Sequence, residues 1–428
     1  MSAKPEQDHM FAENIAHTTY NFKSNILTLK LIVLTLVFHV YIGATLEHLG
    51  FPFGLHIASI APILMIIIYS VFNLSRFKSI KYSTNYWLIV IAIGLLYSML
   101  SSYNYGILDG FATFKTFFIL TVFTLFLNVV MMDEKICNIF HRFFYNILLF
   151  ISCYSIMEFF DRIFFHYIFE TLFNYVSIVN IGGLNYLGFG GGLGIQPLGI
   201  FVDLHTHNSI ILIAGLLAFT EKKYLVFFIA VFALVVSTRV TSIFIFCIGF
   251  GALVVPTGIF LLLLPMIAVV VYFIAENLNG QSWSIIKSHV LNNFSHVFDQ
   301  DVLPFLFGTG YSRSDVVERV GYNEIFFIIF IFSFGIFGVF LLILLMAYII
   351  KSMKKTRLNG LICRYDRLAI ALVVSIPLSL FHYNLFFQPF VLFVYIYIVH
   401  RVLFLKKTNS KYRLIAINHG IVKKTVPV

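Results

Sequence analysis

Charged side chains are scarce in this chain of 428 residues: Asp, Glu, Lys and Arg together make up only 11% of it. Soluble globular domains carry about 25% charged residues, so the composition argues against that class. Cysteines are also few, four in all, and they show no zinc-type spacing. Two of them fall in apolar runs and two in polar segments, so no disulfide framework is indicated.

Hydrophobic residues, by contrast, make up 60% of the chain and aromatic residues 18%, with 51 phenylalanines. This composition predicts an all-α polytopic membrane protein. The first residues lack the charged region, short apolar stretch and small-residue cleavage site of a secretory signal. We therefore expect residues 1–24 to form a cytoplasmic N-terminal tail, followed by a transmembrane helical domain over 25–405.

Apolar segments of about 20 residues, long enough to cross a bilayer, predict about twelve transmembrane helices. They lie near 25–46, 52–73, 87–104, 107–130, 138–158, 206–220, 224–238, 240–255, 258–275, 324–350, 368–386 and 387–405. The run 224–275 is short for three spans and long for two. Three spans, with turns near Ser237–Thr241 and Pro256–Gly258, keep the basic loop 351–367 on the cytoplasmic side, as the positive-inside rule requires.

Lys and Arg follow this topology closely. With both termini cytoplasmic, the inward segments 1–30, 75–86, 131–142, 221–223, 351–367 and 401–428 hold 23 of the 29 Lys and Arg residues. Residues 406–428 form a basic cytoplasmic tail. The net charge of +10 is therefore mostly a result of topology, and no nucleic-acid partner is predicted.

Two outward segments are long, 159–205 and 276–323, and the second is a large loop before span ten. The first is rich in glycine, but no Walker-type Lys-Ser/Thr follows, so we interpret it as a flexible re-entrant or lid-like segment. The second has the amphipathic pattern of a helix on the membrane surface or over a cavity. With fewer than 50 residues it is too short for a soluble domain with a sizeable core.

Arg239 is the only charge in the 52-residue apolar run from Tyr224 to Ala275. An arginine at the bilayer centre costs roughly 2.5–3.5 kcal/mol on insertion scales, so cations within membranes usually face a cavity or a substrate path. The alternative is an arginine that snorkels or caps a helix at the end of a span. Arg162 is another outward cation that the topology does not explain.

His205 and His207 lie with Asp203 at the mouth of span six. Two histidines two positions apart do not share a helical face, and a catalytic zinc site needs three protein ligands. We therefore predict no metal site and expect these side chains to hydrogen-bond a polar substrate or the loop itself.

Three motifs resemble those of one family. Val236-Ser237-Thr238-Arg239-Val240-Thr241-Ser242 follows an apolar run, Phe307-Gly308-Thr309-Gly310-Tyr311 lies in the second outward segment, and Asn323-Glu324 opens a span with Gly335-Ile336-Phe337-Gly338. In order and in predicted side of the membrane, they are similar to motifs of the O-antigen polymerase and ligase superfamily. The resemblance covers about residues 200 to 350.

The resemblance implies a metal-independent glycosyltransferase without a cofactor, in the bacterial inner membrane, with its active site facing the periplasm. The polymerase joins oligosaccharide repeat units carried on undecaprenyl diphosphate, so lipid-linked glycans and membrane lipid are the expected partners, with a chain-length-regulating membrane protein as a further candidate. Arginines would hold the leaving diphosphate, and a base would take the proton of the accepting hydroxyl. The expected catalytic residues are Arg239, Glu324 and Asp203; the expected substrate-binding residues are Arg239, Arg313, Arg319, His205, His207, Tyr311, Tyr322 and Asn323.

Other interpretations of these residues stay open. Exposed ion pairing with Asp315 and Glu318 would explain Arg313 and Arg319 as well, and Glu324 suits a helix start electrostatically. The ligase of the same superfamily would place a histidine near residues 321–324, which this sequence lacks. A flippase or other transporter is the alternative of another class, but the halves of the chain do not repeat as a carrier's would.

Overall fold

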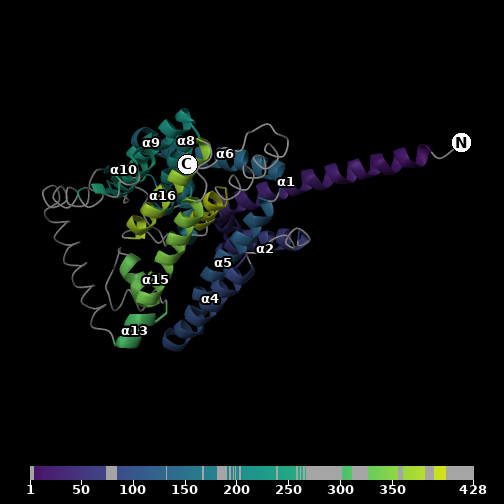
Figure 1. Cartoon of the computed structure of the whole chain (residues 1–428). Coiled ribbons are helices and arrows are strands. Elements are labelled where there is room, and N and C mark those ends of the chain that lie inside the picture. The colour runs from purple at the N-terminus through teal and green to yellow at the C-terminus, as the bar shows by residue number, and fades with distance from the viewer. Residues whose placement is uncertain are drawn as a thin grey trace, which may run out of the picture.

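The computed structural model is almost entirely helical (Figure 1). It describes residues 4–73, 84–131, 133–165, 168–180, 190–191, 194–195, 197, 199–201, 204–237, 240–256, 259–260, 262–263, 266, 301–310, 326–354, 360–380 and 390–401. The helices of the first half are α1 (Lys4–His48), α2 (Gly54–Phe72), α4 (Thr84–Tyr105), α5 (Ile107–Val130), α6 (Glu134–Phe160), the π-helical turn η1 (Asp161–Phe165) and α7 (Ile168–Asn180). Those of the second half are α8 (Leu204–Thr220), α9 (Tyr224–Val236), α10 (Val240–Val254), α13 (Val302–Phe307), α15 (Phe326–Lys354), α16 (Gly360–Leu380) and a last apolar helix, Phe390–Arg401.

The strands β1 (Gly190–Gly191) and β2 (Gly194–Ile195) form a small antiparallel hairpin, which the sequence did not predict. The helical class is confirmed.

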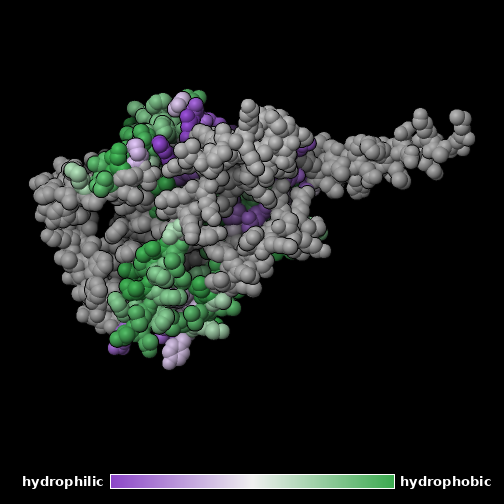
Figure 2. Space-filling view, in the orientation of Figure 1, coloured by the Kyte–Doolittle hydropathy of each residue, from purple (hydrophilic) through white to green (hydrophobic). Residues whose placement is uncertain are grey.

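Among the described residues, three helical stretches are long and apolar enough to cross a membrane, by length and composition: Ser24–His48, Ile107–Val130 and Glu134–Phe165. Several shorter apolar helices accompany them. Hydrophobic side chains also cover the outside of the described helices, over the lower part of Figure 2, where α4, α13 and α15 lie, and over α9 and α10. Leu108 and Leu225, for example, are 83% and 75% exposed. Such a surface suits lipid and indicates a multi-pass membrane protein.

The predicted break inside the run 224–275 is present. Helix α9 ends at Val236 and α10 begins at Val240, so the break falls where the sequence predicts the turn before the eighth span. Helix α10 ends at Val254, just before Pro256. Most of the expected span 258–275 lies outside the described residues, so the number of crossings stays a prediction.

The core is aromatic where α5 and α6 meet the last helix. Phe123 and Phe144 pack on Phe393 with ring centroids 5.2 and 6.2 Å apart, and Phe144 lies 4.4 Å from Tyr397. All four side chains are fully buried. Offset and edge-to-face ring pairs of this kind add to the dispersion energy that holds membrane helices together.

A polar network around Glu221, in the turn between α8 and α9, ties several helices together. Its carboxylate lies 2.6 Å from His141 Nε2 of α6 and 3.2 Å from Lys223 Nζ, and it accepts a hydrogen bond from the Tyr365 hydroxyl of α16. Burial by itself raises the pKa of Glu221, but these hydrogen bonds and charges outweigh burial and lower the pKa to about 2.

The last helix joins the same region. The Tyr397 hydroxyl lies 2.6 Å from His141 Nδ1, and the Arg401 guanidinium donates to Asn138 Oδ1 and to Cys137 Sγ. These contacts bring together residues from 131–142, 221–223, 351–367 and 401–428. The sequence predicts that all four segments lie on the cytoplasmic side, and these contacts place parts of them close together.

Helix α15 covers most of the predicted span 324–350 and breaks at Gly335. This glycine has φ 62° and ψ −173°, which no helix allows. The carbonyls that precede it, of Phe332 and Ser333, instead accept hydrogen bonds from the backbone N–H groups of Thr309 and Gly310, at 2.9 and 3.0 Å. The break is therefore stabilised by an inserted loop, which satisfies the backbone groups that the helix releases.

Candidate functional site

Only one side chain of the predicted site can be placed, that of His207. His205 lies in the first turn of α8, and only its backbone is described. The other predicted site residues lie outside the described residues: Asp203, Arg239, Tyr311, Arg313, Arg319, Tyr322, Asn323 and Glu324. Their assigned roles stay predictions.

His207 and its neighbour Asn208 are both completely buried near the start of α8. Within the part of the chain that the structure describes, neither ring nitrogen of His207 has a hydrogen-bond partner, and neither polar atom of the Asn208 amide has one. A buried polar group left without a partner costs about 1–3 kcal/mol, so such groups in a native protein usually bind water or a ligand. Two adjacent residues of this kind make the beginning of α8 a candidate binding site.

The turn before α8 is shaped around the imidazole of His207. Gly199 has a left-handed backbone with φ 72°, and a Cβ atom at this position would lie 2.5 Å from Cδ2 of His207. Real Cβ atoms essentially never approach another atom so closely. Only glycine fits at position 199, because it has no Cβ atom and so leaves room for the imidazole ring of His207.

A buried ion pair adjoins this turn. Arg162 of η1 is 0% exposed, and its Nε lies 3.4 Å from Oε1 of Glu158, four residues earlier on α6. The other carboxylate oxygen of Glu158 accepts the backbone N–H of Gly199 at 2.7 Å. Glu158 therefore links the end of α6 to the turn that surrounds His207. We call Glu158, Arg162 and His207, together with the buried Asn208 that follows His207 in the sequence, the outer polar cluster.

The backbone around Arg162 departs from a regular helix. Residues Asp161–Phe165 form a π-helical turn, a feature that is frequent at functional sites. The Asp161 carboxylate accepts the backbone N–H groups of Ile168 and Phe169 at 3.3 and 2.9 Å, which caps the start of α7. The predicted re-entrant or lid-like segment 159–205 thus begins with helical structure, and a carboxylate satisfies the first donors of α7 there.

A second constellation joins two of the motifs on which the family resemblance rests. A Cβ atom on Gly335 would lie 2.5 Å from the backbone nitrogen of Gly308, and one on Gly308 would lie 2.6 Å from the nitrogen of Phe334. Both glycines have positive φ, 62° and 78°. The loop 308–310 and the broken helix thus approach each other so closely that both positions need glycine.

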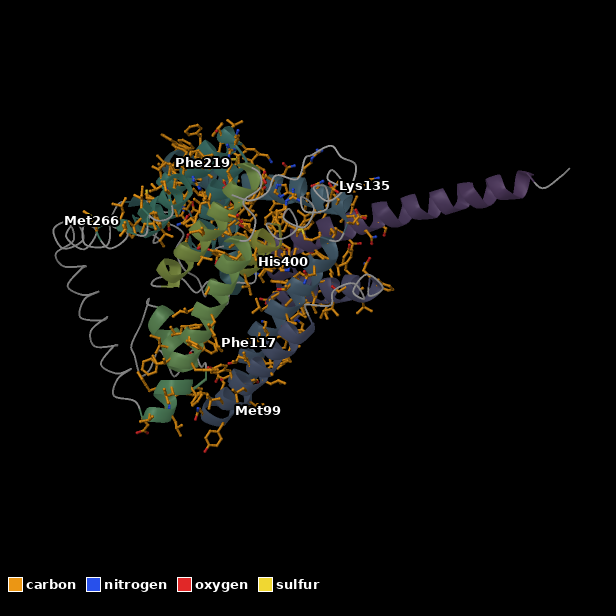
Figure 3. The ribbon with its side chains drawn as sticks, in the orientation of Figure 1. Met99, Phe117, Lys135, Phe219, Met266 and His400 are labelled. Carbon is orange, nitrogen blue, oxygen red and sulfur yellow. The ribbon has the colours of Figure 1, made fainter. Side chains whose placement is uncertain are left out.

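Helix α4 holds this loop from the other side. The Tyr105 hydroxyl donates to Thr309 Oγ1 at 2.6 Å, and Asn104 Nδ2 donates to the Thr309 carbonyl at 2.7 Å. Deeper in the molecule, the Tyr97 hydroxyl donates to the carbonyl of Phe334, whose ring also packs on Phe117 (labelled in Figure 3). Tyr105 directly follows the predicted third span, 87–104, at its predicted outward end, which agrees with the predicted outward position of the loop that it contacts.

The outer polar cluster provides three kinds of chemistry at the predicted outward ends of α6 and α8. Arginine offers forked N–H donors that match phosphate oxygens, and a carboxamide recognises hydroxyl groups. An imidazole or a carboxylate can accept a proton. Among the described residues, no group of three or more His, Cys, Asp or Glu side chains could hold a metal ion.

Sequence reasoning identified His207 and noted Arg162, but it missed Glu158 and Asn208. A signal for Glu158 was available. It ends an apolar span and lies four residues before an arginine, a spacing that places both side chains on one helical face. Asn208 carries no comparable signal, because a single amide at the start of an apolar helix is also common on the surface.

Comparisons with protein-family models, with curated protein sequences and with solved structures find no match for this chain.

Proposed function

We propose that this protein is a glycan polymerase of the bacterial inner membrane. It joins oligosaccharide repeat units carried on undecaprenyl diphosphate into O-antigen or a related surface polysaccharide. In this proposal the chain crosses the membrane twelve times, with both termini cytoplasmic and the active site facing the periplasm. The motif resemblance over residues 200 to 350 suggests this activity.

One structural observation carries the proposal further, namely the outer polar cluster. Desolvating an ionisable side chain inside a membrane protein costs several kcal/mol. Such residues are therefore rare there, and by default they mark a functional site that serves a substrate or an ion pathway. Here a buried Glu158–Arg162 pair is joined through Gly199 to the turn around His207, and His207 and Asn208 lack hydrogen-bond partners among the described residues. This combination suits a substrate that carries both phosphate and hydroxyl groups.

The reaction exchanges one bond for another. The acceptor hydroxyl oxygen attacks the anomeric carbon of the donor glycan, and the bond from that carbon to the diphosphate breaks. The lipid diphosphate leaves with the bonding electrons, and the hydroxyl proton passes to a base. In this proposal Arg239, Arg313 and Arg319 neutralise the leaving diphosphate, and the base is Glu324, Asp203, His205 or His207.

One observed feature favours the transporter alternative, namely the break in helix α15, because carriers often bind substrate or ions at such breaks. In this chain, however, the carbonyls of Phe332 and Ser333 at the break accept hydrogen bonds from the backbone of Thr309 and Gly310. These carbonyl groups are already occupied by the protein. The break therefore supports a structural role for the glycine motif better than an ion site.

The test is the lipopolysaccharide banding pattern on a gel, from a strain that lacks this gene and from the same strain with the gene restored. Polymerase activity predicts that the ladder collapses to core plus a single repeat unit and returns on restoration. Loss of all core-attached glycan, with polymer retained on the lipid carrier, would identify a ligase instead. Loss of outward-facing repeat units would identify a flippase, and an unchanged ladder would overturn the proposal for O-antigen.

A further inference from the structure

A basic cavity opens at the predicted cytoplasmic end of the helices, away from the outer polar cluster along α8. Its volume is about 440 Å³, within the range of small-molecule sites. It lies between the end of α8, the start of α9, the end of α10 and the start of α16; Phe219, labelled in Figure 3, is one of its walls. The lining residues are Phe219, Thr220, Lys222, Tyr224, Leu253, Val254, Arg364 and Arg367.

Charge in this cavity is of one sign. Among the residues that the structure describes, three cations line it, Lys222 from the turn between α8 and α9 and Arg364 and Arg367 from α16, and none of these lining residues is acidic. Glu221, which precedes Lys222 in the sequence, is engaged by His141, Lys223 and Tyr365. Asp366 lies between the two arginines in sequence but does not line the cavity.

The positive-inside rule explains why these cations are cytoplasmic, but it does not explain why they converge. Lys222 and Arg364 are 142 positions apart in the sequence, and the fold brings them to one cavity. Arg367 is held in place there, since its guanidinium donates to the carbonyl of Leu253 at 3.2 Å. Lys222 also has a left-handed backbone with φ 61°, a conformation that few residues other than glycine adopt.

The remaining walls are apolar and aromatic, with Phe219, Tyr224, Leu253 and Val254 beside the cations. An anionic headgroup joined to a hydrophobic tail would satisfy both parts of this surface. Basic pockets between membrane helices on the cytoplasmic side bind phosphate-bearing lipid headgroups in this way, and arginine forks match phosphate oxygens.

We propose that this cavity binds the phosphate group of an anionic phospholipid from the cytoplasmic leaflet. The site is separate from the proposed glycan chemistry and does not depend on it. Bound lipid would join α8, α9, α10 and α16 at their cytoplasmic ends.

The test measures binding of phosphatidylglycerol, phosphatidylcholine and inorganic phosphate to the full-length purified protein in detergent. The test variant is Lys222→Gln/Arg364→Gln, which spares Arg367 and its bond to Leu253. The matched control is Lys135→Gln/Arg142→Gln, which also removes one lysine and one arginine, from exposed positions on the cytoplasmic end of α6. Wild type should prefer phosphatidylglycerol, and the test variant should bind it roughly thirtyfold more weakly, while the control changes little.

Two further arms make the result decisive. Inorganic phosphate should compete with the lipid only at much higher concentration; equal affinity for both would overturn the lipid source and assign the site to free phosphate. Arg364→Lys, which keeps the charge but not the fork, should fall between wild type and the test variant. Equal weakening in the test and control variants, or no preference for the anionic lipid, would overturn the proposal.

Discussion

The carboxylate of Glu158 accepts the backbone N–H of Gly199 at 2.7 Å while its other oxygen faces Arg162 at 3.4 Å. One side chain at the end of α6 thereby fixes both a buried cation and the turn that surrounds His207. The arrangement makes Glu158 the residue on which the geometry of the outer polar cluster depends.

Replacing Glu158 by glutamine should therefore damage this cluster. The amide oxygen can still accept from Gly199, but Arg162 loses its negative partner, and breaking a buried pair costs about 3–5 kcal/mol. We expect a lower thermal unfolding temperature in detergent and loss of chain extension. Glu134→Gln, at the exposed start of the same helix, is the control and should change either measurement little. Equal effects of the two variants would contradict a special role for Glu158.

Gly199→Ala should remove function through a steric collision with His207. Gly50→Ala is a matched control, because Gly50 also has a positive φ, 86°, but has no atom within 4 Å of the position of a Cβ. In the control, the free energy of unfolding should fall only by the backbone cost, roughly 1–2 kcal/mol. Gly199→Ala should lower the unfolding temperature more than the control does. It should also reduce the amount of polymer made by a complemented strain more than the control does. Similar losses would mean that the contact with His207 is unimportant.

The same comparison applies to the glycine motif. Gly335→Ala places a methyl group against the backbone of Gly308, whereas Gly106→Ala, with φ 110°, meets open space. We expect Gly335→Ala to displace the loop 308–310 and to abolish extension, while Gly106→Ala keeps most activity. The amount of inserted protein, measured by immunoblot of membranes, separates a local effect from failure to fold.

Arg239 provides the most direct test of the proposed chemistry. Arg239→Ala should abolish chain extension while the protein still inserts, because the leaving diphosphate loses a forked cation. Arg239→Lys should restore little chain extension for the same reason, because lysine lacks the forked donors. A snorkelling arginine would tolerate lysine, so near-normal ladders from Arg239→Lys would remove this residue from the mechanism.

Glu221 should make the free energy of unfolding fall at low pH. Its pKa falls from an ordinary 4.5 to about 2 in the folded protein, so its contribution to stability is complete above pH 4.5 and is lost as the pH falls toward 2. The contribution is on the order of 3 kcal/mol, at about 1.4 kcal/mol per pKa unit. Wild type and Glu221→Gln should therefore differ in unfolding temperature at pH 6 and converge near pH 2. A gap that stays constant over this range would refute the assignment.

The sequence by itself determined the class of this protein and much of its layout. Apolar runs are local properties, and a continuous apolar stretch in a lipid environment becomes a helix because every backbone group must be satisfied within it. The expected span 107–130 accordingly coincides with α5, and the break before Val240 lies where it was predicted.

Only the tertiary structure decided how distant residues combine. The bond from Gly199 to Glu158 spans 41 positions, and the loop at Thr309 reaches a helix carbonyl 23 residues later. Neither contact leaves a periodic pattern, so neither could be read from the sequence, although the paired glycines and the spacing of Glu158 and Arg162 were visible. The physical reason is that hydropathy records which segments avoid water, whereas the site depends on which buried polar groups find one another, and that is settled only when the helices pack.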